Sequence, residues 1–256
     1  RAHELLSVAA RDGYEAAVAF IRSHYPRDEQ EDTLAFLMGE MARSDLNAVK
    51  ALYPYFAERS VRQSGLGRAA AAWVSRDPEA LLKFIQSHTT DLLQLEFLEQ
   101  SVNASINNRL WDVGTKFADN ITRAHYRTKA FQNLGTAYGH HDPKSAFDWA
   151  ASLPEGVRVQ AQRGAASGAG LKGDLQTLTD VVPVLPPLAR GTAKEVYGRG
   201  AVEQGASPKE LLVSSGGNPS LMSGAIKAAT KDQLLELIPE IRKISNELDR
   251  KRINAS

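Results

Sequence analysis

Residues 130–154, AFQNLGTAYGHHDPKSAFDWAASLP, carry two apolar stripes separated by a turn, and this pattern decides the fold. Within each stripe the apolar residues recur at the three- or four-residue spacing of one helix face. The two stripes are Ala130, Leu134 and Tyr138, then Ala146, Phe147 and Ala150. Between them stands His141-Asp142-Pro143, which ends one helix and starts another. The stretch therefore predicts a helix, a tight turn and a second helix.

The same turn signal recurs along the chain at an almost constant spacing. Its anchors are polar residues that cap helices: Asp12, Asp45, Asp77, Asn108, Asp142, Asp174 and Ser207. Successive anchors are 33, 32, 31, 34, 32 and 33 residues apart. A period in this range is typical of stacked helical hairpins. We therefore expect an all-α protein, a right-handed α-solenoid of about seven helix-turn-helix repeats of about 33 residues.

The residues at the turns agree with this period. Asp, Asn or Ser at each anchor is expected to be the N-cap of the second helix, accepting hydrogen bonds from its first backbone N–H groups. Proline then follows at the first helical position, where its missing N–H costs nothing, at Pro78, Pro143 and Pro208. The turn chemistry therefore supports the same hairpin boundaries as the spacing.

We expect one continuous domain over residues 1–256, with its repeats in residues 5–213. Prolines at 183, 186 and 187 are expected to shorten or bend the second helix of the sixth repeat. The stretch SSGGNPSLMSG, residues 214–224, predicts a loop or hinge. Residues 231–252 predict a polar helix that caps the open end of the array.

Composition limits what kind of protein this is. The chain has 256 residues, 43% hydrophobic and 24% charged, with formal charge +1, which is a composition that folds. It lacks the long apolar run that a membrane span needs. It also lacks cysteine, which excludes disulfides and thiolate ligands and is compatible with an exported or a cytoplasmic protein. Because the chain opens at Arg1, we expect that an N-terminal segment was removed.

The sequence contains no recognisable catalytic or metal-binding motif. HExxH, GxSxG and the P-loop pattern are absent, and the glycine-rich stretch GAGLKG, residues 168–173, has no preceding strand that could deliver a phosphate-binding loop. The one histidine cluster, His140-His141-Asp142, lies at a helix end, where adjacent side chains diverge by about 100°. We therefore expect no enzyme activity, catalytic residue, metal or cofactor.

Period, turn and stripe together resemble the tetratricopeptide-type repeat and its bacterial helical-hairpin relatives. The resemblance is strongest in residues 130–154, where Leu134-Gly135 precedes Tyr138 and Ala146, and Pro154 closes the hairpin. It implies a scaffold whose first helices line a concave groove that binds peptides or protein segments. It does not imply catalysis.

The resemblance also selects groove positions, which can be carried between units by the turn spacing. Residues 1–100 hold 11 basic and 15 acidic residues, whereas residues 101–256 hold 20 and 15, so the charge changes from −4 to +5. The hypothesis is that the C-terminal half of the groove is basic and binds an acidic partner. Its residues would be Lys129, Gln132, His140, Lys172, Lys194 and Tyr197. The plainer alternative is that these are ordinary polar residues between buried stripes.

Two other functions stay open at this point. The chain could be the helical superhelix domain of a larger cell-envelope enzyme such as a lytic transglycosylase, which predicts further sequence beyond its ends. It could also be a nucleic-acid-binding helical repeat. The near-neutral charge argues against the latter, because phosphate-driven binding needs a strongly basic surface.

Overall fold

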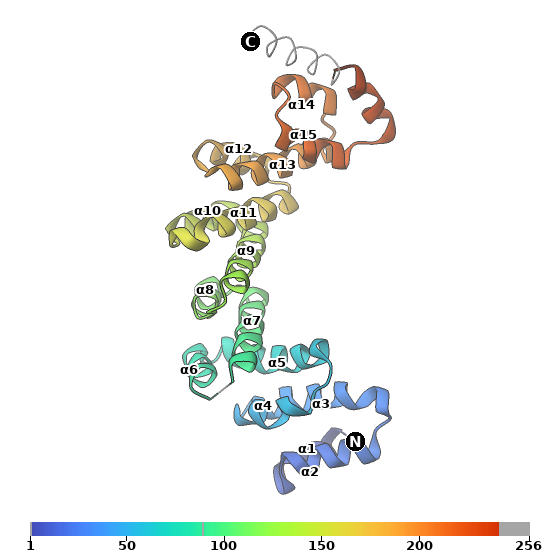
Figure 1. The fold of residues 1–256 in the computed structure, drawn as a ribbon, viewed down its shortest axis with the longest axis vertical. Helices are drawn as coiled ribbons and strands as arrows, with labels where there is room; N and C mark the ends of the chain where they lie inside the picture. The colour runs from blue at the N-terminus through green and yellow to red at the C-terminus, as the bar shows by residue number, and fades with distance from the viewer. Residues whose placement is uncertain (1, 89, 241–256) are drawn as a thin grey trace, which may run out of the picture. The chain divides into compact units, whose positions relative to one another are not determined.

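The computed structural model describes residues 2–88 and 90–240. Regular structure in these ranges is helical, with no strand, so the all-α prediction is confirmed. The chain divides into two compact units, Arg1–Ala130 and Phe131–Ser256 (Figure 1). The sequence predicts one continuous domain instead, and that expectation stays a prediction.

Unit 1 consists of short helices joined by tight turns. They are α1 (Ala2–Asp12), α2 (Tyr14–His24), α3 (Arg27–Ala42), α4 (Asn47–Leu52), η1 (Tyr53–Tyr55), α5 (Arg59–Val74), α6 (Pro78–His88), α7 (Asp91–Asn107), α8 (Trp111–Asp119) and the start of α9 (Ala124–His141). Helix α3 packs on α5, and α5 packs on α7. The even-numbered helices pack beside them.

Unit 2 is also built of helices joined by short turns. It holds the rest of α9, then α10 (Pro143–Ser152), α11 (Glu155–Lys172), α12 (Leu175–Val181), η2 (Val182–Val184), α13 (Pro187–Glu203), α14 (Pro208–Ser214) and α15 (Pro219–Ala228), and residues 231–240 are also helical. Helix α11 packs on α13, and α13 packs on α15. A buried cluster of Ala, Phe and Leu side chains joins α10 to α13, with Phe147 and Leu178 among its members.

All seven turn anchors lie at a junction between two helices, but not every anchor caps the second helix with its side chain. As predicted, Asp142 and Asp174 accept hydrogen bonds from the third backbone N–H after them, at 3.1 and 3.0 Å. Asp77 does the same for Ala80, and Asp45 accepts from Asn47 N–H. The prolines at 78, 143 and 208 open α6, α10 and α14, as predicted.

The cap prediction is wrong at three anchors. Asp12 is the last residue of α1, and Gly13, at φ +90°, precedes α2 because this backbone conformation suits glycine. Asn108 turns back and donates its side-chain amide to the Ala104 carbonyl, so it closes α7 instead of opening α8. Ser207 precedes α14 without a side-chain cap hydrogen bond.

The predicted hinge at residues 214–224 is mostly helix. Gly216 and Gly217, both at positive φ, end α14, and Asn218 then caps α15 by accepting from Leu221 N–H at 3.2 Å. This glycine- and serine-rich stretch is mostly helical because its Gly216, Gly217 and Asn218 lie at helix ends, and Gly224 packs inside α15 against the Glu195 carbonyl.

The helix predicted at residues 231–252 begins as expected. Thr230 and Gln233 exchange backbone-to-side-chain hydrogen bonds, which is a capping box. Leu237 is buried in a cluster with Val202, Leu212 and Met222, so residues 231–240 close the apolar end of unit 2. Residues 241–252 lie outside the described residues. Across the described ranges, no helix is both long enough and apolar enough to cross a bilayer.

Candidate functional site

The backbones of α9 and α11 approach closely in unit 2 because glycines replace side chains at the contact. A Cβ added at Gly164 would lie against the Gln132 carbonyl, and one at Gly168 against the Thr136 carbonyl. Since both positions advance by four residues, the two helices run in the same direction. Such contact requires the absence of a side chain, which explains the Gly- and Ala-rich sequence of α11.

Glycines allow the same close contact between α13 and α15. A Cβ at Gly198 would meet the Leu221 carbonyl, and one at Gly224 would meet the Glu195 carbonyl. Between α11 and α13, Gly170 makes room for the Val196 side chain. Four helices, α9, α11, α13 and α15, therefore lie close together in series, and polar side chains on their outer faces form one surface.

That surface contains a hollow of about 380 Å³, here called the unit 2 groove. Its lining comes from all four helices and is mostly polar. The lining residues are Gln132, Arg163, Ser167, Leu171, Thr192, Glu195, Val196, Arg199, Gly224 and Lys227. Leu171 is 60% exposed and provides an apolar point at the edge of this polar surface.

Arg163 is held in place across the groove. Its Nε donates to Thr192 Oγ1 at 3.1 Å, and its Nη1 donates to Gln160 Oε1 at 3.1 Å. Both acceptors are neutral, so within the described residues no carboxylate neutralises this guanidinium. Arg163 thus presents a fixed positive charge to the groove.

The remaining charges of the groove give it an excess of cations. Glu195 pairs with Lys227 across α13 and α15. Arg199 Nε lies 3.8 Å from Glu203 Oε1, which is a long distance for an ion pair, and both side chains are partly exposed. With three basic residues and one acidic residue in the lining, the groove has a formal charge of +2.

Of the residues predicted from sequence, the structure places Gln132 in this groove. Lys129 and His140 are exposed on the same helix, α9. Lys129, at the end of unit 1, exerts its charge on Glu99, whose pKa is raised by burial and lowered in part by Arg59 and Lys129.

The other three predicted residues lie outside the lining of the groove. Lys172 donates its Nζ to the His141 carbonyl at 3.0 Å and so caps the end of α9. Tyr197 is half-buried against the apolar cluster of unit 2. Lys194 is half-buried on α13. Helices α11 and α13 contact at a shift of 26 to 29 residues, as in the pairs Gly170–Val196 and Arg163–Thr192.

Sequence reasoning therefore missed Arg163, Arg199 and Lys227 as groove residues. Arg163 also bridges α11 to α13 through its bond to Thr192. The available signal was the set of glycines, since Gly164 and Gly168 mark which face of α11 is covered and hence which face remains open.

A second polar cluster lies in unit 1, where Glu96 of α7 is 1% exposed. Arg62 of α5 donates to both of its oxygens, at 2.7 and 2.8 Å, and the Tyr53 hydroxyl donates at 2.9 Å. Arg59 approaches the same carboxylate at 3.4 Å. With its oxygens occupied in this way, Glu96 is an internal connector, not a ligand-binding group.

The pKa values in this cluster follow from burial and hydrogen bonding. Burial alone would raise the pKa of Glu96, but the hydrogen bonds from Arg62 and Tyr53 and the charges of Arg62 and Arg59 outweigh it and lower the pKa. Burial, followed by the hydrogen bond to Glu96, raises the pKa of Tyr53 to about 12. The cluster therefore keeps Glu96 charged and Tyr53 neutral around neutral pH.

The three tryptophans are all half-buried. Trp73 donates its indole N–H to the Ala42 carbonyl at 2.6 Å, and Arg76 stacks over its ring at 4.5 Å. Trp149 lies against Phe131 and Tyr138, with ring centroids 6.4 and 6.0 Å away. Trp73 and Trp149 thus contribute to packing between helices.

Among the described residues, no three His, Asp or Glu side chains are grouped as metal ligands. In the His140-His141-Asp142 cluster, Asp142 accepts from both the backbone N–H and the hydroxyl of Ser145, which lowers its pKa. Comparison of the chain with protein-family models, with curated proteins and with solved structures gave no match.

Proposed function

We propose that the chain is a non-catalytic scaffold whose unit 2 groove binds an acidic segment of a partner protein. In this proposal the chain is a right-handed α-solenoid of about seven helical hairpins, of the tetratricopeptide-like kind. Support for the hairpin array comes from the seven turn anchors at helix junctions and from the packing of odd-numbered helices within each unit, α3 on α5 and α5 on α7 in unit 1, and α11 on α13 and α13 on α15 in unit 2.

The observation that carries the proposal is the chemistry of the groove. Arg163 is positioned by neutral partners, so its guanidinium can still form a bidentate pair with a carboxylate. Arg199, the second arginine, is held by one long contact. An extended segment with acidic side chains and one apolar side chain near Leu171 matches this arrangement, because peptide recognition combines charged contacts with an apolar anchor.

The test is affinity capture from a lysate of the source organism with the immobilised full chain. Arg163→Glu/Arg199→Glu should lose a partner that the wild type retains. A matched variant, Lys144→Glu/Lys231→Glu, reverses two charges on exposed residues outside the lining and should retain it. Circular dichroism establishes that each variant is folded.

A third variant distinguishes the unit 2 groove from the surface formed by the lysines that the sequence predicts. Lys129→Glu/Lys172→Glu/Lys194→Glu changes the lysines chosen from sequence alone. If it loses the partner while the arginine variant keeps it, the groove described here is the wrong surface. If the arginine variant and the wild type capture the same proteins, the proposal fails.

A further inference from the structure

The unit 2 groove follows α11 and α13, because these two helices supply seven of its ten lining residues. On each helix the lining residues recur at the three- or four-residue spacing of one helix face. The seven are Arg163, Ser167 and Leu171 of α11, and Thr192, Glu195, Val196 and Arg199 of α13. The groove therefore offers two rows of side chains along which a partner segment can lie.

Three features follow one another along these rows. The Arg163 guanidinium is fixed at one end by its hydrogen bond to α13. Four residues after that contact, Val196 of α13 packs at Gly170 of α11, so the adjacent Leu171, which is 60% exposed, lies at this level. Arg199 stands three residues beyond Val196 on α13. The order along the groove is thus a positive charge, an apolar side chain and a second positive charge.

The distances along α13 set the spacing of these features. Thr192, which holds Arg163, and Arg199 are seven residues apart, which is about 10 Å on a helix. The Arg199 side chain extends this distance, because its Nε approaches Glu203, one turn further on. In an extended peptide segment, alternate side chains point the same way and lie about 6.6 Å apart. The first and fifth residues of such a segment, about 13 Å apart, therefore match the two arginines, and the third residue lies between them.

We propose that the unit 2 groove recognises a fixed spacing of acidic residues, an inference that rests on the function proposed above. The bound segment is extended and carries acidic residues at its first and fifth positions and an apolar residue at its third. The two carboxylates pair with Arg163 and Arg199, and the apolar side chain packs on Leu171. Charge alone does not decide binding, because acidic residues only two positions apart reach one arginine at a time.

Fluorescence anisotropy of labelled peptides titrated with the full chain tests the spacing. The matched peptide has the core Glu-Ser-Leu-Ser-Glu between glycines. Its isomer, with the core Glu-Leu-Glu-Ser-Ser, has the same composition and charge but places the two acidic residues only two positions apart. Wild type should bind the matched peptide about tenfold more tightly, which is the factor expected for one charge-assisted hydrogen-bonded contact.

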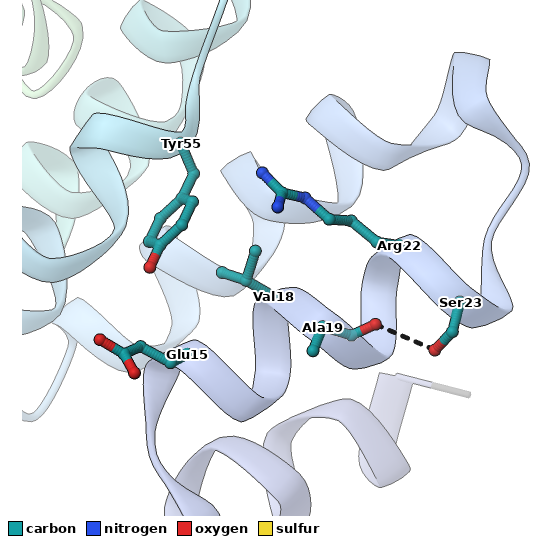
Figure 2. A pocket seen from close by; sticks show the side chains of 6 residues that line it. All are labelled: Glu15, Val18, Ala19, Arg22, Ser23 and Tyr55. Carbon is teal, nitrogen blue, oxygen red and sulfur yellow. Dashed lines mark hydrogen bonds between the residues drawn. The ribbon is translucent and has the colours of Figure 1, made fainter.

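Arg199→Ala should bind both peptides equally, because one carboxylate of either peptide then has no arginine to pair with. A cleft in unit 1 provides a control for the loss of an arginine elsewhere. Figure 2 shows this cleft, which has a volume of about 430 Å³ and is lined by Glu15 and Arg22 of α2 and by Tyr55 of η1, among others. Its one acidic and one basic side chain cancel in formal charge, so Arg22→Ala should leave the peptide preference of the wild type unchanged.

Three results overturn the proposal. Equal binding of the two peptides by wild type removes the spacing rule, and the function proposed above survives this result if Arg163→Glu/Arg199→Glu loses both peptides. Absence of binding by either peptide contradicts that function as well. A preference for the matched peptide that persists in Arg199→Ala would show that the second contact does not involve this arginine.

Discussion

Arg62 and Glu96 form a bidentate ion pair inside unit 1, with Nε–Oε2 and Nη2–Oε1 distances of 2.7 and 2.8 Å. The pair joins α5 to α7, and the side chains are 13% and 1% exposed. The two residues are 34 positions apart in the sequence. The pair therefore links two helices that are separated in sequence by α6.

Glu96→Ala should destabilise the packing of α5 on α7 strongly. The change leaves the Arg62 charge without its partner in a largely buried place, which typically costs about 3–5 kcal/mol. Hydrogen exchange measured by mass spectrometry should show faster exchange of the amides in α5 and α7. Lys116→Ala, which removes an exposed pair with Glu79 in the same unit, serves as control and should change their exchange little. Equal protection in wild type and Glu96→Ala would show that the pair does not hold these helices.

The free energy of unfolding should fall at acidic pH partly because the Glu96 carboxylate becomes protonated. The lowered pKa of Glu96 means that its contribution is fully present above the ordinary value of 4.5 and is lost as pH falls through the folded-state pKa. Urea unfolding measured between pH 7 and pH 3 should therefore show a decline that is reduced in Glu96→Gln. A decline of the same size in both proteins would assign it to other carboxylates.

The loss of stability at alkaline pH should depend in part on the ionisation of Tyr53. Its pKa is raised from 10.0 to about 12, so its contribution is fully present below pH 10 and is lost as pH rises toward 12. Tyr53→Phe removes this titration, and the stability of the variant should fall less steeply above pH 10. Spectrophotometric titration of phenolate absorbance should show a tyrosine that titrates near pH 12 in wild type and the loss of this phase in the variant. Persistence of that late phase in Tyr53→Phe would contradict the assignment.

Two glycines of α11 should respond oppositely to the same substitution. Gly168→Ala inserts a methyl group against the Thr136 carbonyl and should cost about 1–3 kcal/mol, because the backbones must separate. Gly156→Ala meets no atom within 4 Å and should be neutral or stabilising by up to about 1 kcal/mol. Urea unfolding measures both. Destabilisation of equal size would mean that α9 and α11 are not in close contact.

The sequence predicted the helices and their turns better than it predicted the surface. The turn period and the capping prolines depend on local chemistry, so the anchors at Asp142 and Asp174 could be assigned with their cap bonds. Gly216 and Gly217 show the limit of that method, because composition does not distinguish a hinge from a helix end.

The groove could not be placed because the open face of a helix depends on how far its neighbours are shifted. Glycines let α9 and α11 approach closely, and this contact sets the shift that turns Lys172 toward α9 and leaves Arg163 facing the groove. The Arg62–Glu96 pair was missed for the same reason, since its members are neighbours only after packing.

The most direct test of the central claim is selection from a library of random displayed peptides on the immobilised full chain. The account predicts that wild type enriches peptides rich in Asp and Glu and that Arg163→Glu/Arg199→Glu does not. Selection of the same peptides by both proteins, or no enrichment of acidic peptides by wild type, would contradict it.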